Sequence, residues 1–289
     1  MNRGSSVQTS NMIRPEDRYS ESTIAGFRSA GFWRDGSLSE ALDRWAEQQG
    51  DKRAVSDGYG ALTWAELRAQ AYRLAARLRG LGIEPGDRVQ AQLPSWNEFV
   101  VLYAALARIG AVLVPTMPIY RGDEVRYAIN HGEAKISVVT GTYRRFDYLN
   151  MIRELRPECP TLEHVIAVRA GAAEDCLSWD ELIAGDDVPG DDVLGPPPGP
   201  DQAHAIIYTS GTESRPKGCY HTFNTFGYTV HTLGGDVMGL TPDDVMFMPS
   251  PITHATGLAV GVTTPIVLGC GMHLLDHWEA GPALDRIRD

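Results

Sequence analysis

A run of hydroxyl and glycine residues that ends in a lysine lies between residues 209 and 217. It reads Thr-Ser-Gly-Thr-Glu-Ser-Arg-Pro-Lys and follows a short apolar stretch, Ala205 to Tyr208. Small residues let backbone N–H groups approach anionic oxygens, hydroxyl groups add donors, and a lysine supplies positive charge. The apolar stretch predicts a buried strand, and a helix is expected from about His221. Strand, loop, lysine and helix in this order are typical of a phosphate-binding site.

The run differs from the phosphate-binding loop that reads Gly, four residues, then Gly-Lys-Ser/Thr. Pro216 stands where the second glycine is required, and Gly218 follows Lys217 where Ser or Thr is required. The run resembles instead the signature loop of the adenylate-forming superfamily, Tyr-Thr-Ser-Gly-Thr-Thr-Gly-x-Pro-Lys-Gly. This superfamily includes acyl-CoA synthetases, luciferases and peptide-synthetase adenylation domains. We call residues 209–217 the signature loop; it departs from the pattern only at Glu213 and Ser214.

The resemblance implies a reaction in two steps. A carboxylate attacks the α-phosphate of ATP bound with Mg²⁺, giving an acyl-adenylate and pyrophosphate, and the thiol of coenzyme A then takes the acyl group. Most of the barrier lies in aligning two anions and in stabilising charge. The resemblance gives Lys217 a catalytic role and places Thr212 near the metal ion. The residues that it implies for nucleotide binding are Thr209, Ser210, Gly211, Thr212, Glu213, Ser214 and Lys217.

Glu213 stands where the family has Thr or Ser. A carboxylate roughly 6 Å from a phosphate charge, at an effective dielectric near 20, costs about 3 kcal/mol. We therefore expect Glu213 to turn away from the phosphates, to pair with Arg215 or to share the magnesium ion.

His254 is the second catalytic candidate. Its block, Pro-Ile-Thr-His-Ala-Thr-Gly-Leu from Pro251 to Leu258, resembles the family's Pro-Leu-Phe-His-x-x-Gly block. In the family this residue lines the carboxylate end of the acyl pocket. Without the resemblance, a histidine in a proline-rich loop is more often an incidental surface residue. The block follows the signature loop by one strand–helix–strand step, which predicts that both lie on the same edge of one sheet, where ligands of α/β folds collect.

The elements that must position these residues alternate along the chain. Two capping boxes, Ser37 with Glu40 and Thr63 with Glu66, begin predicted helices. Short apolar strands then alternate with helices, one of them expected from about residue 143 to 156. This spacing predicts an α/β protein with largely parallel sheets.

A proline- and glycine-rich stretch from 185 to 200 cannot be a helix or a central strand. It predicts a linker between two layered α/β subdomains, 37–195 and 196–289, after an N-terminal extension, 1–36. The second subdomain carries the signature loop. The resemblance implies that this second subdomain is incomplete, because known members continue past the equivalent of Asp289. Their adenine- and ribose-binding blocks and a C-terminal domain with a catalytic lysine follow there, so the 289-residue chain is expected to be inactive alone.

The composition of the chain argues against several classes of function. A hydrophobic content of 43% and a charged content of 22% are those of a globular protein. The net charge of −11 argues against nucleic-acid binding. No apolar run reaches the length of a membrane span, and the polar N-terminus is not a signal peptide. The 4 cysteines are widely spaced, which predicts neither disulfides nor a zinc site and fits the cytoplasm.

Three hypotheses follow. The first is an AMP-forming acid–CoA ligase that uses ATP, Mg²⁺ and coenzyme A on a small-molecule carboxylic acid; the loop variant is most similar to ligases for medium-chain or alicyclic acids. The second is a non-catalytic nucleotide- or acyl-binding module. The third is a phosphotransferase with a convergent loop, but it would need a base and a metal-binding acid near the loop, and no convincing pair is present. The sequence leaves the acid, the acyl acceptor and the oligomeric state open.

Overall fold

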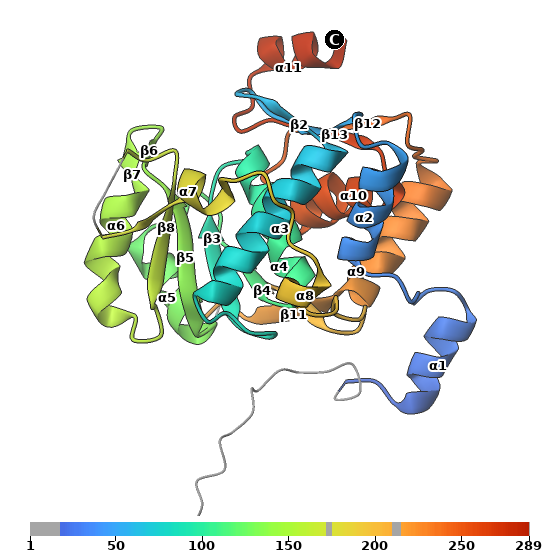
Figure 1. Ribbon diagram of the computed structural model, residues 1–289, viewed down its shortest axis with the longest axis horizontal. Helices are drawn as coiled ribbons and strands as arrows, with labels where there is room; N and C mark the ends of the chain where they lie inside the picture. The colour runs from blue at the N-terminus through green and yellow to red at the C-terminus, as the bar shows by residue number, and fades with distance from the viewer. Residues whose placement is uncertain (1–17, 172–174, 210–214, 289) are drawn as a thin grey trace, which may run out of the picture.

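The computed structural model describes residues 18–171, 175–209 and 215–288, and their strands form two main sheets flanked by helices (Figure 1). The larger sheet has seven strands, six of which run parallel. Its strands, in spatial order, are β11 (Gly218–Thr222), β10 (Ala203–Tyr208), β4 (Val112–Pro115), β3 (Arg88–Gln92), β5 (Ala134–Thr140), β8 (His164–Val168) and β9 (Leu177–Ser178). Most residues of β3, β4 and β5 are buried, as expected for parallel strands covered on both faces.

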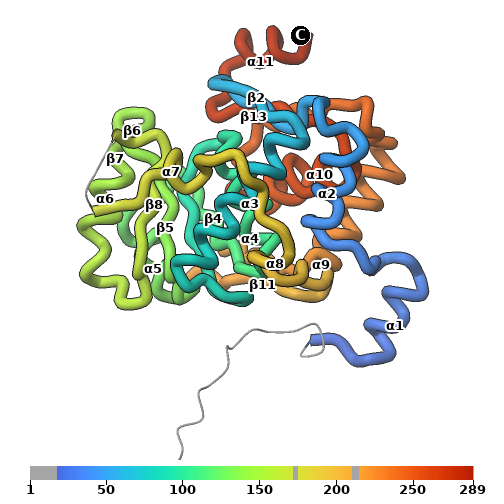
Figure 2. Tube along the Cα trace, viewed as in Figure 1, coloured from blue at the N-terminus to red at the C-terminus, as the bar shows by residue number. Residues whose placement is uncertain are grey.

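The smaller sheet has four strands and joins distant parts of the chain. Its order is β12 (Val245–Met248), β13 (Gly271–Leu274), β1 (Arg53–Ser56) and β2 (Ala61–Thr63). β1 runs parallel to β13, with Val55 opposite Met272, whereas β2 returns antiparallel to β1. The tube in Figure 2 shows this meeting of an early segment with a late one.

The strands of the two sheets are not divided between residues 195 and 196, where the boundary between the two subdomains was expected. β10 and β11, from the expected second subdomain, extend the sheet of the first, and β1 and β2 belong to the sheet of the second. The proline-rich stretch between them packs on the body. Leu194 is buried there, and Asp191 forms an ion pair with the buried Arg108.

Two central helices give both sheets one shared core. They are α3 (Trp64–Gly80) and α4 (Asn97–Ile109), which pack against each other between the sheets (Figure 1). Every residue of α4 except Glu98 is buried, and a helix buried all round belongs in a protein interior. A single apolar cluster therefore runs from Val89 in the larger sheet to Met272 in the smaller one.

The remaining helices cover the outer faces. Both predicted capping boxes are present, at Ser37 before α2 and at Thr63 before α3. The other helices of the described chain are α1 (Glu21–Ser29), α2 (Leu38–Gln48), α5 (Gly122–His131), α6 (Tyr148–Leu155), η2 (Arg156–Glu158), α7 (Trp179–Ile183), α8 (Asp191–Leu194), α9 (Phe223–Thr229), η3 (Val230–Val237), η4 (Gly257–Thr263), α10 (Thr264–Leu268) and α11 (Ala280–Arg288).

The helix expected from about His221 is present and begins at Phe223, but the strand β11 before it, residues 218–222, was not predicted. One local prediction was wrong. The helix expected from residue 143 is preceded by a small hairpin, β6 (Thr142–Tyr143) and β7 (Phe146–Asp147), and α6 begins only after Asp147 caps it. Arg144 and Arg145 form the hairpin turn in the left-handed region, with φ of 49° and 66°. Non-glycine residues seldom adopt this conformation, and sequence patterns do not reveal it.

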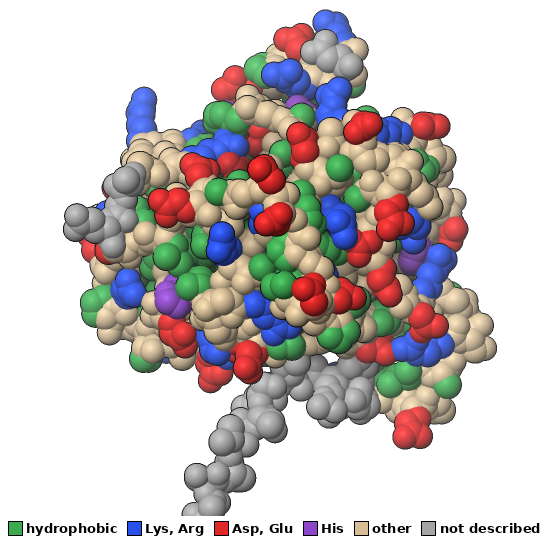
Figure 3. Space-filling view, viewed as in Figure 1, with side chains coloured by type: hydrophobic (Ala, Val, Ile, Leu, Met, Phe, Trp, Pro, Cys, Tyr) green, Lys and Arg blue, Asp and Glu red, His purple; other side chains and the backbone are tan. Residues whose placement is uncertain are grey.

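The described part of the N-terminal extension contacts the body through α1 and the residues after it. Trp33 is buried against Phe27 and Tyr19, and Arg28 pairs with Asp201. Within the described residues, no helix combines the length and apolar character that crossing a bilayer requires. On the face shown in Figure 3, acidic and basic side chains are interspersed, so the net negative charge is not gathered into one patch there.

Candidate functional site

The two described ends of the signature loop are held together by hydrogen bonds. β10 and β11 pair antiparallel, so the loop joins two adjacent strands. The Thr209 N–H donates to the Lys217 carbonyl at 3.0 Å, and the Lys217 N–H donates to Thr209 Oγ1 at 3.3 Å. Both side chains are exposed. Ser210, Gly211, Thr212, Glu213 and Ser214 lie outside the described residues.

A strand lies between the lysine and the helix that follows it. The sequence predicted that helix from about His221, four residues after the lysine. The five residues of β11 separate Lys217 from α9, and the Thr222 hydroxyl caps that helix. In the described part of the loop, the positive charges are those of Arg215 and Lys217, both exposed.

Gly218 is required by close packing between the two strands. A Cβ atom at this position would lie 2.9 Å from Ile206 Cγ2 and 3.4 Å from the Tyr208 ring. The glycine after the lysine therefore lets β11 lie close to β10.

His254 lies in a turn at the start of η4. Its carbonyl accepts from the Leu258 N–H at 2.8 Å, and its N–H donates to the Pro251 carbonyl at 3.1 Å. The imidazole is exposed. Gly257 is needed here because any Cβ atom would clash with the Pro251 carbonyl oxygen. The motif's histidine and glycine are thus parts of one tight turn into a helix.

The prediction that both motifs lie on one sheet edge was wrong. The signature loop follows β10 in the seven-stranded sheet, whereas His254 follows β12 in the four-stranded sheet. Among the described residues, no hydrogen bond or ion pair joins His254 to Thr209 or Lys217. Strand order cannot be read from spacing alone, because β12 finds its partner in β13 rather than in β10.

A buried polar network links the two motifs instead. His204 of β10 lies 3.1 Å from the Tyr103 hydroxyl, which lies 3.0 Å from Thr263 Oγ1 in η4. Because the Thr263 hydroxyl donates to the Leu258 carbonyl at 2.9 Å, it accepts from Tyr103, and His204 Nδ1–H donates to Tyr103. Burial, with a smaller contribution from the nearby His221, lowers the pKa of His204 to about 3. The neutral histidine ties the strand before the signature loop to the helix after His254.

The carboxyl ends of four strands from both sheets meet at a cavity of about 690 Å³, which we call the inter-sheet pocket. Such crevices are where α/β folds bind ligands. The Thr253 side chain lines the pocket, and its buried hydroxyl has no hydrogen-bond partner among the described residues. The residues that follow the four strands and line the pocket include Leu93 and Pro94, Met117 and Pro118, Pro249 and Pro251, and Leu275 and Asp276.

Charged side chains also line the inter-sheet pocket. Arg121 and Arg144 contribute to its wall, and both are exposed. Asp276 accepts at Oδ2 from Trp96 Nε1 at 3.2 Å and from the Tyr59 hydroxyl at 3.4 Å. The pocket therefore combines an apolar lining with two cationic groups and a positioned carboxylate.

Arg169 joins the two sheets beside this pocket, and nothing in the sequence around it signals that role. Its guanidinium donates to Glu98 at 2.6 and 2.9 Å and to Asp57 at 3.2 Å. It also lies 4.2 Å from the ring centroids of Tyr59 and Trp96. Its own φ of 49° is unusual for a non-glycine residue. Because Asp57 follows β1 and Arg169 follows β8, this cluster fixes one sheet against the other.

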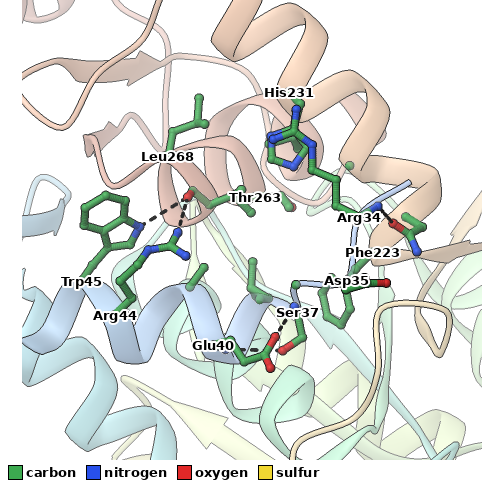
Figure 4. Close-up of a pocket in the computed structure, with 17 residues that line it drawn as sticks. Arg34, Asp35, Ser37, Glu40, Arg44, Trp45, Phe223, His231, Thr263 and Leu268 are labelled. Carbon is green, nitrogen blue, oxygen red and sulfur yellow. Dashed lines mark hydrogen bonds between the residues drawn. The ribbon is translucent and has the colours of Figure 1, made fainter. Parts of the chain in front are cut away.

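A second cavity of about 690 Å³ lies between α2, η3 and α10 (Figure 4). Arg44 Nη2 and Trp45 Nε1 both donate to the Val267 carbonyl near the end of α10, at 3.2 and 3.4 Å. Ser37 and Glu40 form the capping box of α2. These polar groups end one helix and begin another, and neither Lys217 nor His254 lines the cavity.

The described residues contain no group of three or more His, Cys, Asp or Glu side chains that could hold a metal ion. Thr212, which the resemblance places near Mg²⁺, lies outside them.

The comparisons with known proteins fit this geometry. Residues 42–288 match the model of the AMP-binding enzyme family, and the chain belongs to that family. The predicted family and the α/β fold with largely parallel sheets are therefore confirmed.

Two curated relatives show different acceptors in their names. The chain is 34% identical over 260 residues to the medium-chain fatty-acid–CoA ligase of Escherichia coli, covering 89% of this chain and 45% of that protein. It is 35% identical over 250 residues to the salicyl-AMP ligase/salicyl-S-ArCP synthetase of Mycobacterium tuberculosis, covering 85% and 42%. The structure of apo MbtA from Mycobacterium smegmatis is similar with a TM-score of 0.83 and 31% identity, over 93% of this chain and 49% of that one. The chain thus spans about half, or less, of the length of these relatives.

Proposed function

We propose that this chain carries the phosphate- and acid-binding residues of an AMP-forming acid–CoA ligase. The observation that carries the proposal is the pair of hydrogen bonds between Thr209 and Lys217, which closes a hairpin loop of the family's signature sequence. Lys217 would bind the ATP polyphosphate with a charge-assisted hydrogen bond. Ser210, Gly211, Thr212 and Ser214 would add backbone and hydroxyl donors. Mg²⁺ near Thr212 would neutralise part of the phosphate charge.

The acid would bind in the inter-sheet pocket, whose lining includes Thr253 but neither His254 nor Lys217; His254 would reach its carboxylate from the adjoining turn. Thr253, the preceding residue in the chain, lines the inter-sheet pocket, and its buried hydroxyl has no hydrogen-bond partner among the described residues. A carboxylate that accepts from this hydroxyl would satisfy a buried group that otherwise costs about 1–3 kcal/mol. The apolar body of the acid would contact Leu93 and Leu275 in the same lining.

Coenzyme A is the acceptor that we propose, rather than a carrier protein. Coenzyme A bears phosphate groups at the end opposite its thiol, and Arg121 and Arg144 line the inter-sheet pocket. Arg121 donates to the Pro118 and Tyr120 carbonyls and stacks on Phe146, so Arg144, which is exposed, is the better placed of the two to meet a phosphate. Arginine is well suited to phosphate because its planar fork can form two parallel hydrogen bonds.

Calorimetry with the purified chain tests the assignment of the acid site. Octanoate and salicylate represent the acids named for the relatives, and ATP with Mg²⁺ is titrated separately. We expect His254→Ala to weaken binding of the preferred acid roughly ten- to a hundredfold, the loss typical of a hydrogen bond to a charged group, and to leave ATP affinity unchanged. His231→Ala, which alters the second cavity, is the matched control and should change neither.

The opposite pattern, with ATP weakened and the acid unaffected, would move His254 to the nucleotide side. The acceptor is tested with the same chain by titrating coenzyme A and pantetheine, which lacks the nucleotide phosphates. Equal affinity for the two would contradict phosphate recognition by the pocket arginines and favour a carrier-bound acceptor.

A further inference from the structure

One face of α5 contacts both described ends of the signature loop. The Tyr127 hydroxyl donates to the Pro216 carbonyl at 2.8 Å, directly before Lys217. Four residues later, His131 Nδ1 lies 2.9 Å from the Tyr208 hydroxyl, directly before Thr209. Residues four apart lie on the same face of a helix. A single helix face therefore holds both Tyr208, the residue directly before the loop, and Pro216, the second-last residue of the loop.

The rings of this face also pack together. Tyr127 and His131 are stacked with centroids 5.0 Å apart, and Tyr208 meets each of them edge-on, at 5.8 and 5.6 Å. Burial raises the pKa of Tyr208, with the Tyr127 hydroxyl adding to the effect. The Tyr208 phenol therefore keeps its proton at neutral pH and can donate it to His131. Packing of this kind limits how far either end of the loop can move from α5.

The contact made by Tyr127 acts on a particular peptide group. The carbonyl of the Pro216–Lys217 peptide accepts from Tyr127, and the N–H of the same peptide donates to Thr209 Oγ1. Both polar atoms of this peptide are thus held, one by α5 and the other by the start of the loop. Because a peptide group is planar, fixing its two polar atoms fixes the position of the Lys217 Cα atom. The Thr209 N–H holds the carbonyl of the next peptide, so the backbone on both sides of the Lys217 side chain is restrained.

We propose that Tyr127 is a positioning residue for Lys217, acting through the Pro216–Lys217 peptide. This inference rests on the proposed function, in which Lys217 binds the polyphosphate. Preorganised donors bind charge better than mobile ones because they need no reorganisation when the ligand arrives. Loss of the Tyr127 hydroxyl should leave the lysine present but free to take other orientations.

The test is Tyr127→Phe, which removes the hydroxyl and keeps the ring that packs on His131. Mg·ATP and Mg·tripolyphosphate are titrated into the 289-residue chain by calorimetry. We expect both ligands to bind about two- to tenfold more weakly, the range for one lost hydrogen bond. Tyr72→Phe is the matched control: its hydroxyl donates to Asp43 at 2.7 Å, and its loss should leave both affinities unchanged.

The double variant Tyr127→Phe/Lys217→Ala decides how Tyr127 acts. If Tyr127 works through Lys217, the double variant should bind no more weakly than Lys217→Ala alone, because the two losses are not additive. Full additivity, or normal affinity in Tyr127→Phe, would overturn the positioning role while leaving the proposed function intact. If Lys217→Ala binds as well as the unaltered chain, the proposed function itself fails. The two failures are therefore distinguishable.

Discussion

Arg169 directly follows strand β8, and Lys217 directly precedes strand β11. Their charged side chains lie in opposite environments. The Arg169 guanidinium is paired with two carboxylates and covered by two aromatic rings. Lys217 is held by its backbone, while its side chain is exposed. One charge is committed to contacts within the protein, and the other is presented to solvent on a fixed peptide.

This difference separates a structural charge from a binding charge. A buried ion is costly unless it is paired, so the carboxylate of Asp57, 1% exposed, depends on Arg169 and on nearby backbone N–H groups. An exposed lysine has little desolvation to overcome before it meets an anion. Substitution should therefore affect stability at Arg169 and ligand affinity at Lys217.

The largest expected effect is on folding. Arg169→Met keeps an unbranched chain but removes the charge, which leaves Asp57 and Glu98 without their cationic partner. Breaking a buried ion pair from one side costs about 3–5 kcal/mol. Because Asp57 is buried but the Arg169 side chain is 27% exposed, denaturant unfolding should show a loss of about 3 kcal/mol, the lower end of that range. The control is Arg153→Met, which removes an exposed pair with Asp175 at 2.7 Å and should cost about 1 kcal/mol or less.

Equal losses in the two variants would contradict the distinction between a buried and an exposed pair. They would show that the Arg169 cluster does not fix the two sheets against each other.

A smaller effect is expected from pH at His204, in the strand that leads to the signature loop. The pKa of His204 in the folded chain, about 3, lies below the ordinary value of 6.5. At a pH between these two values, the histidine binds a proton in the unfolded chain but not in the folded chain. The contribution of His204 to the free energy of unfolding is therefore complete above pH 6.5. It falls as the pH drops below 6.5, by up to about 1.4 kcal/mol per pH unit. Between pH 7 and 5 we expect a loss of about 2 kcal/mol.

The measurement is denaturant unfolding at both pH values for the unaltered chain and for His204→Asn. Asparagine does not titrate and keeps a group that can hydrogen-bond Tyr103, so its pH-dependent loss should be about 2 kcal/mol smaller. The same loss in both chains would mean that the histidine is not held neutral.

Local signals in the sequence predicted much of the fold. Both capping boxes act within a few residues, and the strands and helices of the α/β core were recognisable from their periodicity. The signature loop stands out as a sequence motif, and its assignment to phosphate binding stays a prediction. The pairing of strands that are distant in sequence was not predicted. Val55 pairs with Met272, and β10 joins the sheet of β4 rather than that of β12. These partners are chosen by packing across a shared core, which no short pattern encodes.

The site was predictable to the same extent. Lys217, Thr209 and His254 stand in recognisable motifs, and the structure brings Lys217 and Thr209 together. Arg169 and Tyr127 were missed because each owes its role to partners distant in sequence. Thr253 stands beside His254 in a recognised motif, but only the structure shows that its hydroxyl is buried without a hydrogen-bond partner among the described residues. Arg169 reaches Glu98 over 71 positions and Tyr127 reaches Pro216 over 89. Neither spacing has a sequence signature.

The central claim is that Lys217 binds the polyphosphate of ATP, and calorimetric titration of Mg·ATP into the unaltered chain and into Lys217→Ala tests it most directly. A charge-assisted hydrogen bond contributes about 1.5–3 kcal/mol. We therefore expect Lys217→Ala to bind Mg·ATP roughly ten- to a hundredfold more weakly, with an unchanged unfolding midpoint because the side chain is exposed. Equal affinity in the two chains would remove Lys217 from the site and contradict the account.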